Sequence, residues 1–432
     1  MKIYSFPRGG LQYDDPTAPF KADVEDAFLP PLSVVVLENS FMKAYPIVSV
    51  GDHVREGMLI GRASGVSGVN VHAAVPGKVI RKVSWRDTDD LENSAFVIKM
   101  EGAFERLGRR EEIYQWKGVS SYDLQRIFYD HGIVEMESPE RPLSEMVSAN
   151  RKKDKITLVV RCVFDDPWLA ADYALCKTRM NAVVEGAGIV AKACVKTSQI
   201  IFAVSHREKD LGLSLLSAAQ KLEIPSSLVL TGSRYPQRNN RELELTLRAY
   251  GKKENVDLGS VLILGPAVLA AAYDAVVHNK PVLERFVAVG GSAIKKPRIM
   301  RVRIGTQIGE VIEQCEGFVN KLEKVITGSP LSGREVKYLD EPVGKSCYAI
   351  VAMTKSQVSA HKPQNCINCG ECSAVCPVGL DPQHIFKQLK TFAVENVSVT
   401  GCHGCGCCKI VCPSSLSLSE TILEKKLEAS IG

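Results

Sequence analysis

The sequence predicts a multidomain protein that combines α/β and α+β folds, and three features of the chain support this class. Short β-type runs broken by glycine and aspartate occupy residues 32–83. Apolar runs then alternate with amphipathic helices between residues 156 and 282, which is typical of a mostly parallel sheet covered by helices. Near the end, two cysteine runs of matching spacing predict a small helical unit built around metal.

Composition excludes several other classes. The chain has 432 residues, of which 45% are hydrophobic and 24% charged, as in an ordinary globular protein of two to four domains. The net charge of +5 is spread along the chain, so we expect no nucleic-acid partner. The N-terminus lacks the apolar core of a signal peptide. The most apolar run, Val261 to Val277, contains Pro266 and Asp274, and we expect a strand, a turn and a helix there instead of a membrane span.

The two cysteine runs are the clearest indication of a metal or cluster site in the sequence. They read Cys366-x-x-Cys369-x-x-Cys372-x-x-x-Cys376-Pro377 and Cys402-x-x-Cys405-x-x-Cys408-x-x-x-Cys412-Pro413. Thiolates suit zinc or iron–sulfur clusters, and three cysteines spaced two residues apart can surround a cubane from a tight loop. In two-cluster ferredoxins the fourth cysteine, before the proline, ligates the other cluster. We therefore assign one 4Fe–4S cluster to Cys366, Cys369, Cys372 and Cys412, and a second to Cys402, Cys405, Cys408 and Cys376.

Zinc and disulfides are the alternative explanations for these cysteines. Zinc sites usually take cysteines in separated pairs, often with histidine, and disulfide frameworks belong to small secreted domains. Thiolate-bound iron instead implies a reducing compartment. Cys407 lies out of phase with its run, and we expect it to be a neighbour of the cluster, not a ligand. His403 could hydrogen-bond near a cluster sulfur, but we expect an exposed loop histidine.

Residues 1–30 are rich in proline, glycine and aspartate and predict an irregular arm. Short strands then predict a small sandwich or barrel, at residues 33–37, 44–48, 58–61, 69–73 and 77–83. The phrases VGDHVREGMLIG and VHAAVPGKV resemble the barrel-sandwich hybrid of biotinyl and lipoyl carriers. The tip of the hairpin offers no lysine for a prosthetic group, which favours a structural or docking module. His72 is expected to be an ordinary strand residue.

Residues 102–155 are charged and helix-prone, with Leu124, Ile127 and Phe128 on one face, and they predict a linker. Four strand–helix units follow, with strands at 156–160, 200–204, 227–230 and 260–264 and a first helix over 170–187. No glycine-rich phosphate loop follows any of these strands. The stretch Gly186-Ala187-Gly188 is interpreted as a helix C-cap. Residues 283–318 return to β-type runs with one helix at 309–315, which predicts a β-grasp-like unit.

Taken together, these segments resemble RnfC, the NADH-side peripheral subunit of the Rnf ion-pumping electron-transport complex. The resemblance rests on FPRGGLQ, VHAAVPGKV, the stretch from Pro281 to Ile312 that matches a soluble-ligand-binding β-grasp (SLBB) domain, and the paired cysteine runs. It implies the following domains: 1–101, arm and barrel-sandwich hybrid; 102–155, linker; 156–282, Rossmann-like α/β domain; 283–355, SLBB β-grasp and β extension; 356–432, two-4Fe–4S ferredoxin-like domain.

The family carries FMN and reacts with NAD(H) in its α/β domain, and there this sequence departs. The family's glycine-rich loop is replaced by Gly132 to Pro142, which contains three glutamates. Side chains in such a loop block the close approach of backbone N–H groups to a phosphate, and carboxylates repel it. The family's acidic segment becomes Arg161 to Pro167, with Phe164 at one acidic position. Its YPxGGE segment becomes Tyr235 to Asn240, without the glycines. We therefore expect a degenerate FMN/NADH site with no catalytic residue assigned.

The expected function is an iron–sulfur electron-transfer subunit of an Rnf-type complex, relaying electrons through two 4Fe–4S clusters. Its partners would be the other subunits and possibly a soluble carrier or flavoprotein. We expect it on the cytoplasmic side, attached peripherally to the inner face of the membrane through those subunits. An active NADH:acceptor oxidoreductase subunit with an altered FMN pocket, an assembly or docking subunit, and a cobalamin-reductase relative are the alternatives.

Overall fold

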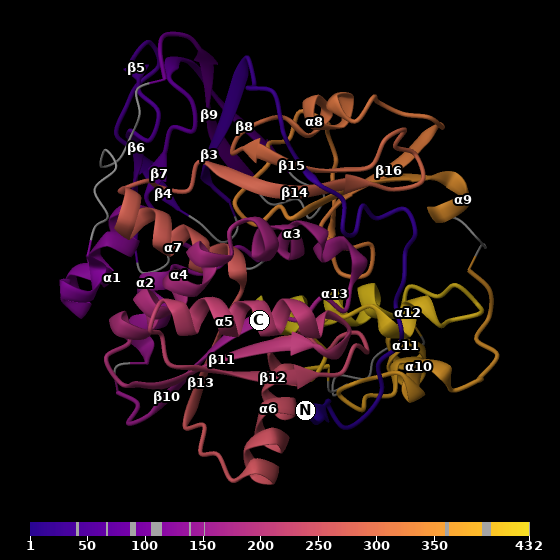
Figure 1. The fold of residues 1–432 in the computed structure, drawn as a ribbon. Helices are drawn as coiled ribbons and strands as arrows, with labels where there is room; N and C mark the ends of the chain where they lie inside the picture. The colour runs from indigo at the N-terminus through magenta and orange to yellow at the C-terminus, as the bar shows by residue number, and fades with distance from the viewer. Residues whose placement is uncertain are drawn as a thin grey trace.

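The computed structural model describes residues 1–39, 43–65, 68–86, 92–104, 115–137, 140–150, 152–358, 363–390 and 399–431. In this part of the chain, strands form four sheets. Figure 1 shows a barrel (indigo) and a β-grasp sheet (orange) on one side of an α/β unit (magenta), with the cysteine-containing tail (yellow) at its edge. Within these residues, none of the helices is both long and apolar enough to cross a membrane.

The α/β unit is built on a parallel sheet in the order β1-β12-β11-β10-β13. Every residue of β10 is buried, because helices cover both faces of the sheet. The four predicted strands are confirmed, and the N-terminal arm adds β1 at one edge. The strands are β1 (Ile3–Tyr4), β10 (Ile156–Cys162), β11 (Thr197–Ser205), β12 (Ser226–Thr231) and β13 (Ser260–Leu264).

The helices of this unit include two that lie within the predicted linker. Leu124 and Phe128 of α1 and Leu143 of α2 are buried in the main core, so residues 115–150 pack into the α/β unit; residues 105–114, 138–139 and 151 lie outside the described part. The helices are α1 (Ser121–Asp130), α2 (Leu143–Ala149), α3 (Ala170–Thr178), α4 (Met180–Ala193), α5 (Lys209–Lys221), α6 (Asn240–Glu254) and α7 (Pro266–His278).

The C-cap predicted at Gly186-Ala187-Gly188 is wrong, because all three residues lie inside α4. The single helix predicted over 170–187 is in fact α3 and α4. Gly186 is needed for packing: a Cβ there would lie 2.0 Å from the carbonyl oxygen of Leu269 on α7. Glycine therefore lets two helix backbones approach each other, despite its low helix propensity.

The barrel consists of two sheets, β3-β9-β8-β5 and β4-β6-β7, that share one apolar core around Val35, Ile60, Val79 and Ile98. This confirms the predicted small barrel. Its strands are β3 (Leu32–Glu38), β4 (Ala44–Pro46), β5 (His53–Val54), β6 (Leu59–Ala63), β7 (Val71–His72), β8 (Gly77–Arg86) and β9 (Glu92–Met100).

The β-grasp sheet has the order β17-β16-β18-β14-β15-β2, and α8 packs on one face through Ile308, Val311 and Ile312. Its edge strand β2 comes from the N-terminal arm, so the arm contributes strands to two sheets and is less irregular than its composition predicts. The elements are β2 (Val24–Asp26), β14 (Glu284–Gly290), β15 (Arg298–Arg303), α8 (Ile308–Gln314), β16 (Leu322–Thr327), β17 (Arg334–Glu335) and β18 (Ala349–Thr354).

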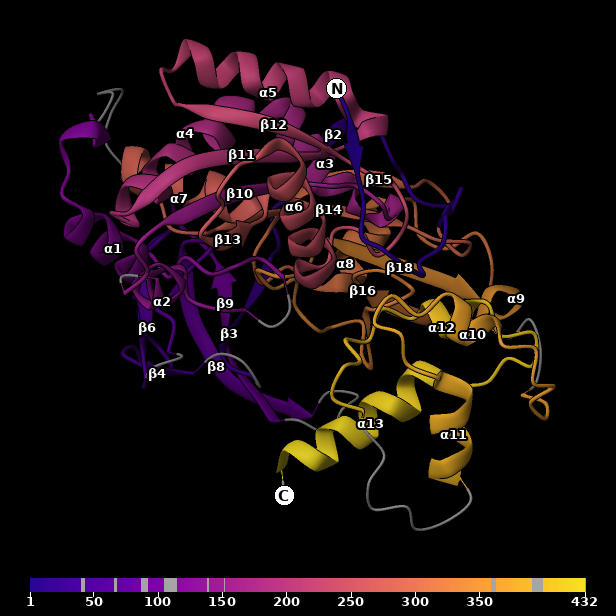
Figure 2. The same cartoon turned by 90° about the horizontal axis from the view of Figure 1, so that it is seen from below.

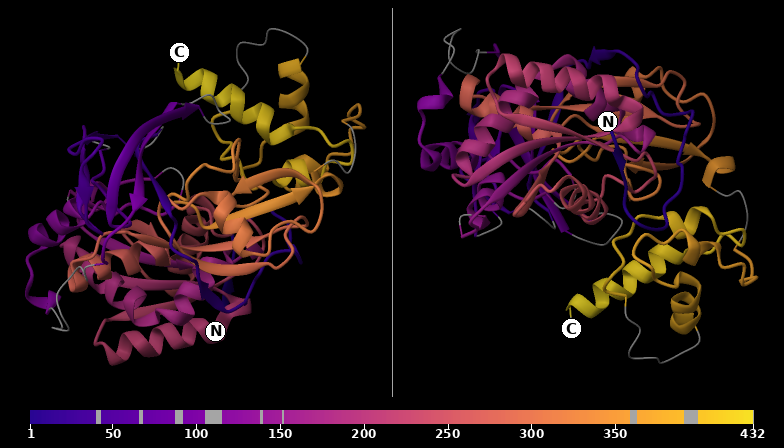
Figure 3. Two further views of the ribbon diagram at one scale, coloured as in Figure 1. Left: turned by 90° about the horizontal axis from the view of Figure 1, so that it is seen from above. Right: turned by 60° about the horizontal axis from the view of Figure 1, so that its bottom comes forward.

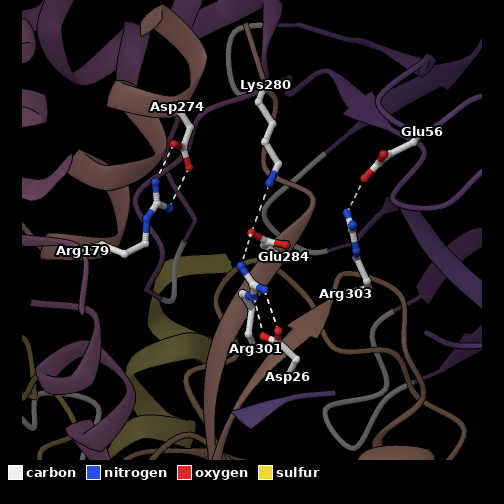
Figure 4. A network of polar contacts seen from close by, with 8 residues as sticks. All are labelled: Asp26, Glu56, Arg179, Asp274, Lys280, Glu284, Arg301 and Arg303. Carbon is white, nitrogen blue, oxygen red and sulfur yellow. Dashed lines mark hydrogen bonds and ion pairs between the residues drawn. The ribbon is translucent and has the colours of Figure 1, made fainter. Parts of the chain in front are cut away.

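Ion pairs on β15 join this sheet to its neighbours (Figure 4). Arg303 Nη1 lies 2.5 Å from Glu56 Oε1 of the barrel, and Arg301 Nε lies 2.7 Å from Asp26 Oδ1 of the arm. Arg301 also lies near Glu284 of β14. These contacts fix the barrel and the arm against the β-grasp sheet.

Gly186→Ala should lower the free energy of unfolding of the α/β unit by about 1–3 kcal/mol, because the new methyl group overlaps the α7 backbone. Gly188→Ala, in the same helix, is the matched control. Its Cβ would meet side-chain atoms of Ile224 and Trp116 at 3.0 Å, and side chains can move aside. Urea denaturation followed by circular dichroism measures both variants, and equal losses would contradict the explanation.

Candidate metal centre

The tail contains both cysteine runs. The helices in its described residues are α9 (Lys355–Val358), α10 (Glu371–Ala374), α11 (Pro382–Lys390), α12 (Cys407–Ile410) and α13 (Leu418–Ile431). The two runs fold alike. In each, a glycine with positive φ, Gly370 or Gly406, precedes a four-residue helix whose second residue is a buried cysteine, Cys372 or Cys408. The repeat in sequence is therefore also a repeat in backbone conformation.

The first predicted ligand set surrounds one cavity. The cavity encloses about 300 Å³, part of it open solvent, and its other lining residues include Gln383 and Leu416. Four cysteines line it: Cys366, Cys369, Cys372 and Cys412. Cys412 comes from the second run, so the structure brings together the crossed set that the cysteine–proline spacing predicts. Four thiols around one space fit a cubane, which takes one sulfur ligand at each of four corners. Among the described residues, no group of three histidine, cysteine or acidic side chains is placed to hold a single metal ion.

The second predicted set also lies together. Burial raises the pKa of the Cys402 thiol, and the neighbouring Cys405 and Cys376 raise it further. The pKa of Cys408 is raised in the same way, by burial and then by Cys405, Cys402 and Cys376. Cys376, the cysteine–proline residue of the first run, thus interacts electrostatically with the second run. That these four cysteines hold one cluster stays a prediction.

Two further residues of the second run, Cys407 and His403, have buried environments. Cys407 is fully buried, and its hydrogen bond with Cys405 lowers the pKa of Cys405 to about 7. That it is not a ligand stays a prediction. The exposed position expected for His403 is wrong: its ring bonds Asn239 Nδ2 at 3.1 Å and the buried Glu242 at 3.3 Å. Although burial lowers the pKa of His403, the hydrogen bond to Glu242 raises it above its ordinary value.

The N-terminal arm fastens the tail to the α/β unit (Figures 2 and 3). Gly10 N–H donates to Val375 O at 2.8 Å, and Leu11 exchanges backbone hydrogen bonds with Tyr235 at 2.8 and 2.9 Å. Tyr235 in turn donates its hydroxyl to Cys405 O at 2.8 Å. Gly9 has φ +64°, and a Cβ there would lie 2.6 Å from the Cys376 backbone. Sequence reasoning missed this role, and the pair Gly9-Gly10 was the signal that could have shown it.

Residues of the three segments in which this sequence is expected to depart from the RnfC pattern converge near the carboxyl end of β10. Arg161 of β10 is 5% exposed and lies 2.5 Å from Glu137 Oε1 and 3.6 Å from Glu135 Oε1. The guanidinium group of Arg238 pairs with the same Glu137 oxygen, and the backbone N–H of Arg238 donates to Asp165 Oδ2 at 3.0 Å. The region is thus filled by an ion-pair network, defined here as Glu135, Glu137, Arg161, Asp165 and Arg238.

Helix α7 begins inside this network, at the end of β13. A helix N-terminus is a common anion site, but here the side chain of Glu135 occupies it: Gly265 N–H donates to Glu135 Oε1 at 3.4 Å. Burial, and then Glu137, raise the pKa of Glu135 to about 7. Burial alone would raise the pKa of Glu137 too, but Arg161 and Arg238 lower it below its ordinary value. The glutamates therefore obstruct the site mainly by occupying it, since arginines neutralise their charge. The residues present do not fit a flavin phosphate.

Comparison with known proteins agrees with this architecture. Residues 7–103 match the RnfC barrel sandwich hybrid domain, and residues 286–338 match the NQRA C-terminal domain, an SLBB domain. Over most of its length the chain is similar to the C components of ion-translocating oxidoreductase complexes, which confirms the resemblance inferred from the sequence.

Two of these relatives illustrate the extent of the similarity. The C component of the proton-translocating ferredoxin:NAD(+) oxidoreductase complex of Clostridium ljungdahlii is 27% identical over 383 residues, covering 87% of this chain and 82% of the relative. The C component of the ion-translocating oxidoreductase complex of Rhodobacter capsulatus is 26% identical over 387 residues, covering 88% and 74%. A chain of an NAD+-reducing [NiFe]-hydrogenase superposes with a TM-score of 0.48 and 12% identity, over 66% of this chain and 58% of that one, which is too weak to support an argument.

Glu137→Gln should lower the free energy of unfolding by about 3–5 kcal/mol, because two buried guanidinium groups lose their carboxylate. Glu244→Gln on α6 is the matched control. Its pair with Arg248 is about half exposed, at 41% and 52%, so its loss should cost less than about 1 kcal/mol. Chemical denaturation of both variants provides the measurement, and a Glu137→Gln effect no larger than that of the control would show the network to be unimportant for stability.

Asp165 makes the stability of the protein depend on pH. Burial raises its pKa from 3.8 to about 7, so the folded state holds this proton more tightly than the unfolded state does. The contribution is fully present below the unfolded pKa and is lost as pH rises toward 7. Asp165→Asn removes the charge, so its free energy of unfolding relative to wild type should increase between about pH 4 and pH 7.

The exposed Asp257 provides a control in which the stability difference from wild type changes with pH in the opposite direction. A hydrogen bond from Lys155 lowers the pKa of Asp257 below its ordinary 3.8, so Asp257→Asn should lose stability relative to wild type as pH rises through the acidic range around that value, with no further change toward pH 7. Denaturation at a series of pH values measures both differences. A flat difference for Asp165→Asn would contradict the burial argument.

Proposed function

We propose that this chain is an iron–sulfur electron-transfer subunit of an Rnf-type, membrane-associated complex. The observation that carries the proposal is the cavity that Cys412 shares with three cysteines of the first run. The two clusters would be held by Cys366, Cys369, Cys372 and Cys412, and by Cys402, Cys405, Cys408 and Cys376.

When bound, 4Fe–4S clusters supply one-electron chemistry at potentials set by their surroundings. The work of the chain is to hold the two thiolate sets close together, to shield them and to fix them relative to partners. Buried apolar side chains serve the shielding: Leu416 and Leu418 pack beside Cys372 and Cys408. The N-terminal arm and Tyr235 fix the tail against the α/β unit through hydrogen bonds.

The α/β domain in this proposal has no flavin and no NADH reaction. The ion-pair network occupies the space at the carboxyl end of β10, and the N-terminus of α7 faces Glu135. Electrons would therefore enter and leave through other proteins. Those are the other subunits of the complex, a proposal supported by the names of the relatives, and possibly a soluble carrier or flavoprotein. The chain would lie at the cytoplasmic face of the membrane, attached through those subunits.

We expect holoprotein purified without oxygen to contain about eight iron and eight sulfide per chain, no stoichiometric FMN, and clusters that NADH does not bleach. Cys408→Ala should lose about half of the iron, whereas Cys407→Ala, its buried neighbour, should retain all of it. Elemental analysis, flavin fluorescence and visible absorption measure these quantities.

The other outcomes identify the alternatives. Bound FMN with NADH-dependent bleaching would favour an active NADH:acceptor oxidoreductase subunit with an altered pocket. A docking subunit would be favoured if the protein contained both clusters and their removal abolished assembly of the complex without changing electron flux. Zinc in place of iron and sulfide would remove the electron-transfer proposal.

A further inference from the structure

The connection between β12 and the first turn of α6 contacts the second cysteine run with two side chains. Tyr235 is 3% exposed and donates its hydroxyl to Cys405 O at 2.8 Å. Asn239 Nδ2 lies 3.1 Å from one ring nitrogen of His403. Residues 235–242, called the support segment below, therefore reach both ends of the loop between the first two cysteines of this run.

The first turn of α6 adds contacts through two charged residues of the support segment. Glu242 is fully buried and lies 3.3 Å from the other ring nitrogen of His403. Arg241 Nη1 donates to Glu242 Oε1 at 2.8 Å and lies 3.5 Å from Pro377 O. Pro377 directly follows Cys376, the residue of the first run that is assigned to the second ligand set.

Three of the four proposed ligands of the second set are thus held from outside the tail. For Cys405 the contact is to the cysteine itself, and for Cys402 and Cys376 it is to the next residue in the chain. The N-terminal arm reinforces this side, because a Cβ at Gly9 would lie 2.6 Å from the Cys376 backbone. The α/β unit and the arm together surround the second set.

The first ligand set has different surroundings. Every residue that lines its cavity lies between positions 366 and 418, within the tail itself. Gln383 of α11 is one of them, and its Oε1 lies 4.0 Å from Cys366 Sγ. The two sets therefore repeat in sequence but differ in what fixes their ligands.

Side chains that hydrogen-bond to the ligands of a metal site orient those ligands and tune the metal, although they do not touch it. The hydroxyl of Tyr235 also directs the positive end of its dipole at Cys405, and such a dipole favours the more negative, reduced state of a cluster. The support segment thus has the contacts needed both to orient the second set and to influence its potential.

We propose that Tyr235, Asn239 and Arg241 are positioning residues for the second ligand set, and that they control the retention and the potential of its cluster without affecting the first. The inference rests on the proposed function. The segment from Tyr235 to Asn240, interpreted from the sequence as a lost part of a nucleotide pocket, has a structural task at the second cluster instead.

The test uses full-length holoprotein prepared without oxygen. Tyr235→Phe removes only the hydroxyl that binds Cys405, and Asn239→Ala is a second variant that releases His403. Tyr250→Phe is the matched control, since Tyr250 lies near the other end of α6 and packs against Tyr4 with ring centroids 5.3 Å apart. Iron release to the chelator bathophenanthroline and redox titration followed by electron paramagnetic resonance are measured. Cys408→Ala assigns the signals, because those absent from it belong to the second set.

Tyr235→Phe should release the iron of the second set about tenfold faster and shift the potential of that cluster to a lower value. Asn239→Ala should also speed this release, and Tyr250→Phe should match wild type in both measurements. Unchanged release and potential in both Tyr235→Phe and Asn239→Ala would overturn the inference, as would equal changes at both clusters, since the tail would then have loosened as a whole. Iron and sulfide analysis separates the two proposals: absence of clusters overturns both, whereas two clusters that neither variant alters overturn only this one.

Discussion

The ion pair between Arg161 and Glu137 connects most of the structure described here. A guanidinium group buried at the end of a central strand must be neutralised, because an unpaired buried charge is very costly. Glu137 lies 2.5 Å from it and also binds Arg238. Asn239, the next residue after Arg238, hydrogen-bonds to the ring of His403. Tyr235, shortly before Arg238 in the chain, donates its hydroxyl to the carbonyl oxygen of Cys405. A chain of short contacts thus leads from the centre of the parallel sheet to the second cysteine run.

The same network pairs the buried charged groups at the carboxyl end of β10 with side chains of the chain itself. Buried polar groups of a folded protein need hydrogen-bonding or charged partners. Here carboxylates take the place of an anion at the start of α7 and arginines balance them. That the α/β unit has no flavin stays a prediction. The geometry of the cysteine runs depends on local loops and on the arm, which bonds the first run through Gly10 and Val375.

The features that sequence could predict are those with a local cause. The buried run of β10 and the glycine positions before α10 and α12 follow from residues close together in the chain. The crossed cysteine sets are predicted from spacing, and the four cysteines of the first set line one cavity. The ion pairs of Arg161 could not be predicted, because its partners at 135 and 137 are identified only by folding. The burial of His403 depends on Glu242, which is 161 residues away along the chain. Gly186 is easily misinterpreted, because a glycine within a helix looks like an end until its neighbour, α7, is known.

The arm that starts the chain has a consequence for the order of assembly. Gly10 bonds Val375, and Ile3 pairs with Leu230 in β12, so the arm can make these contacts only after the chain has been synthesised beyond those distant residues. Contacts between such distant residues form late, since each must close a long loop. The α/β unit can therefore fold around its central strand first, with one sheet edge still open. Closure of that edge is coupled to the positioning of the tail, because the same arm bonds both β12 and Val375.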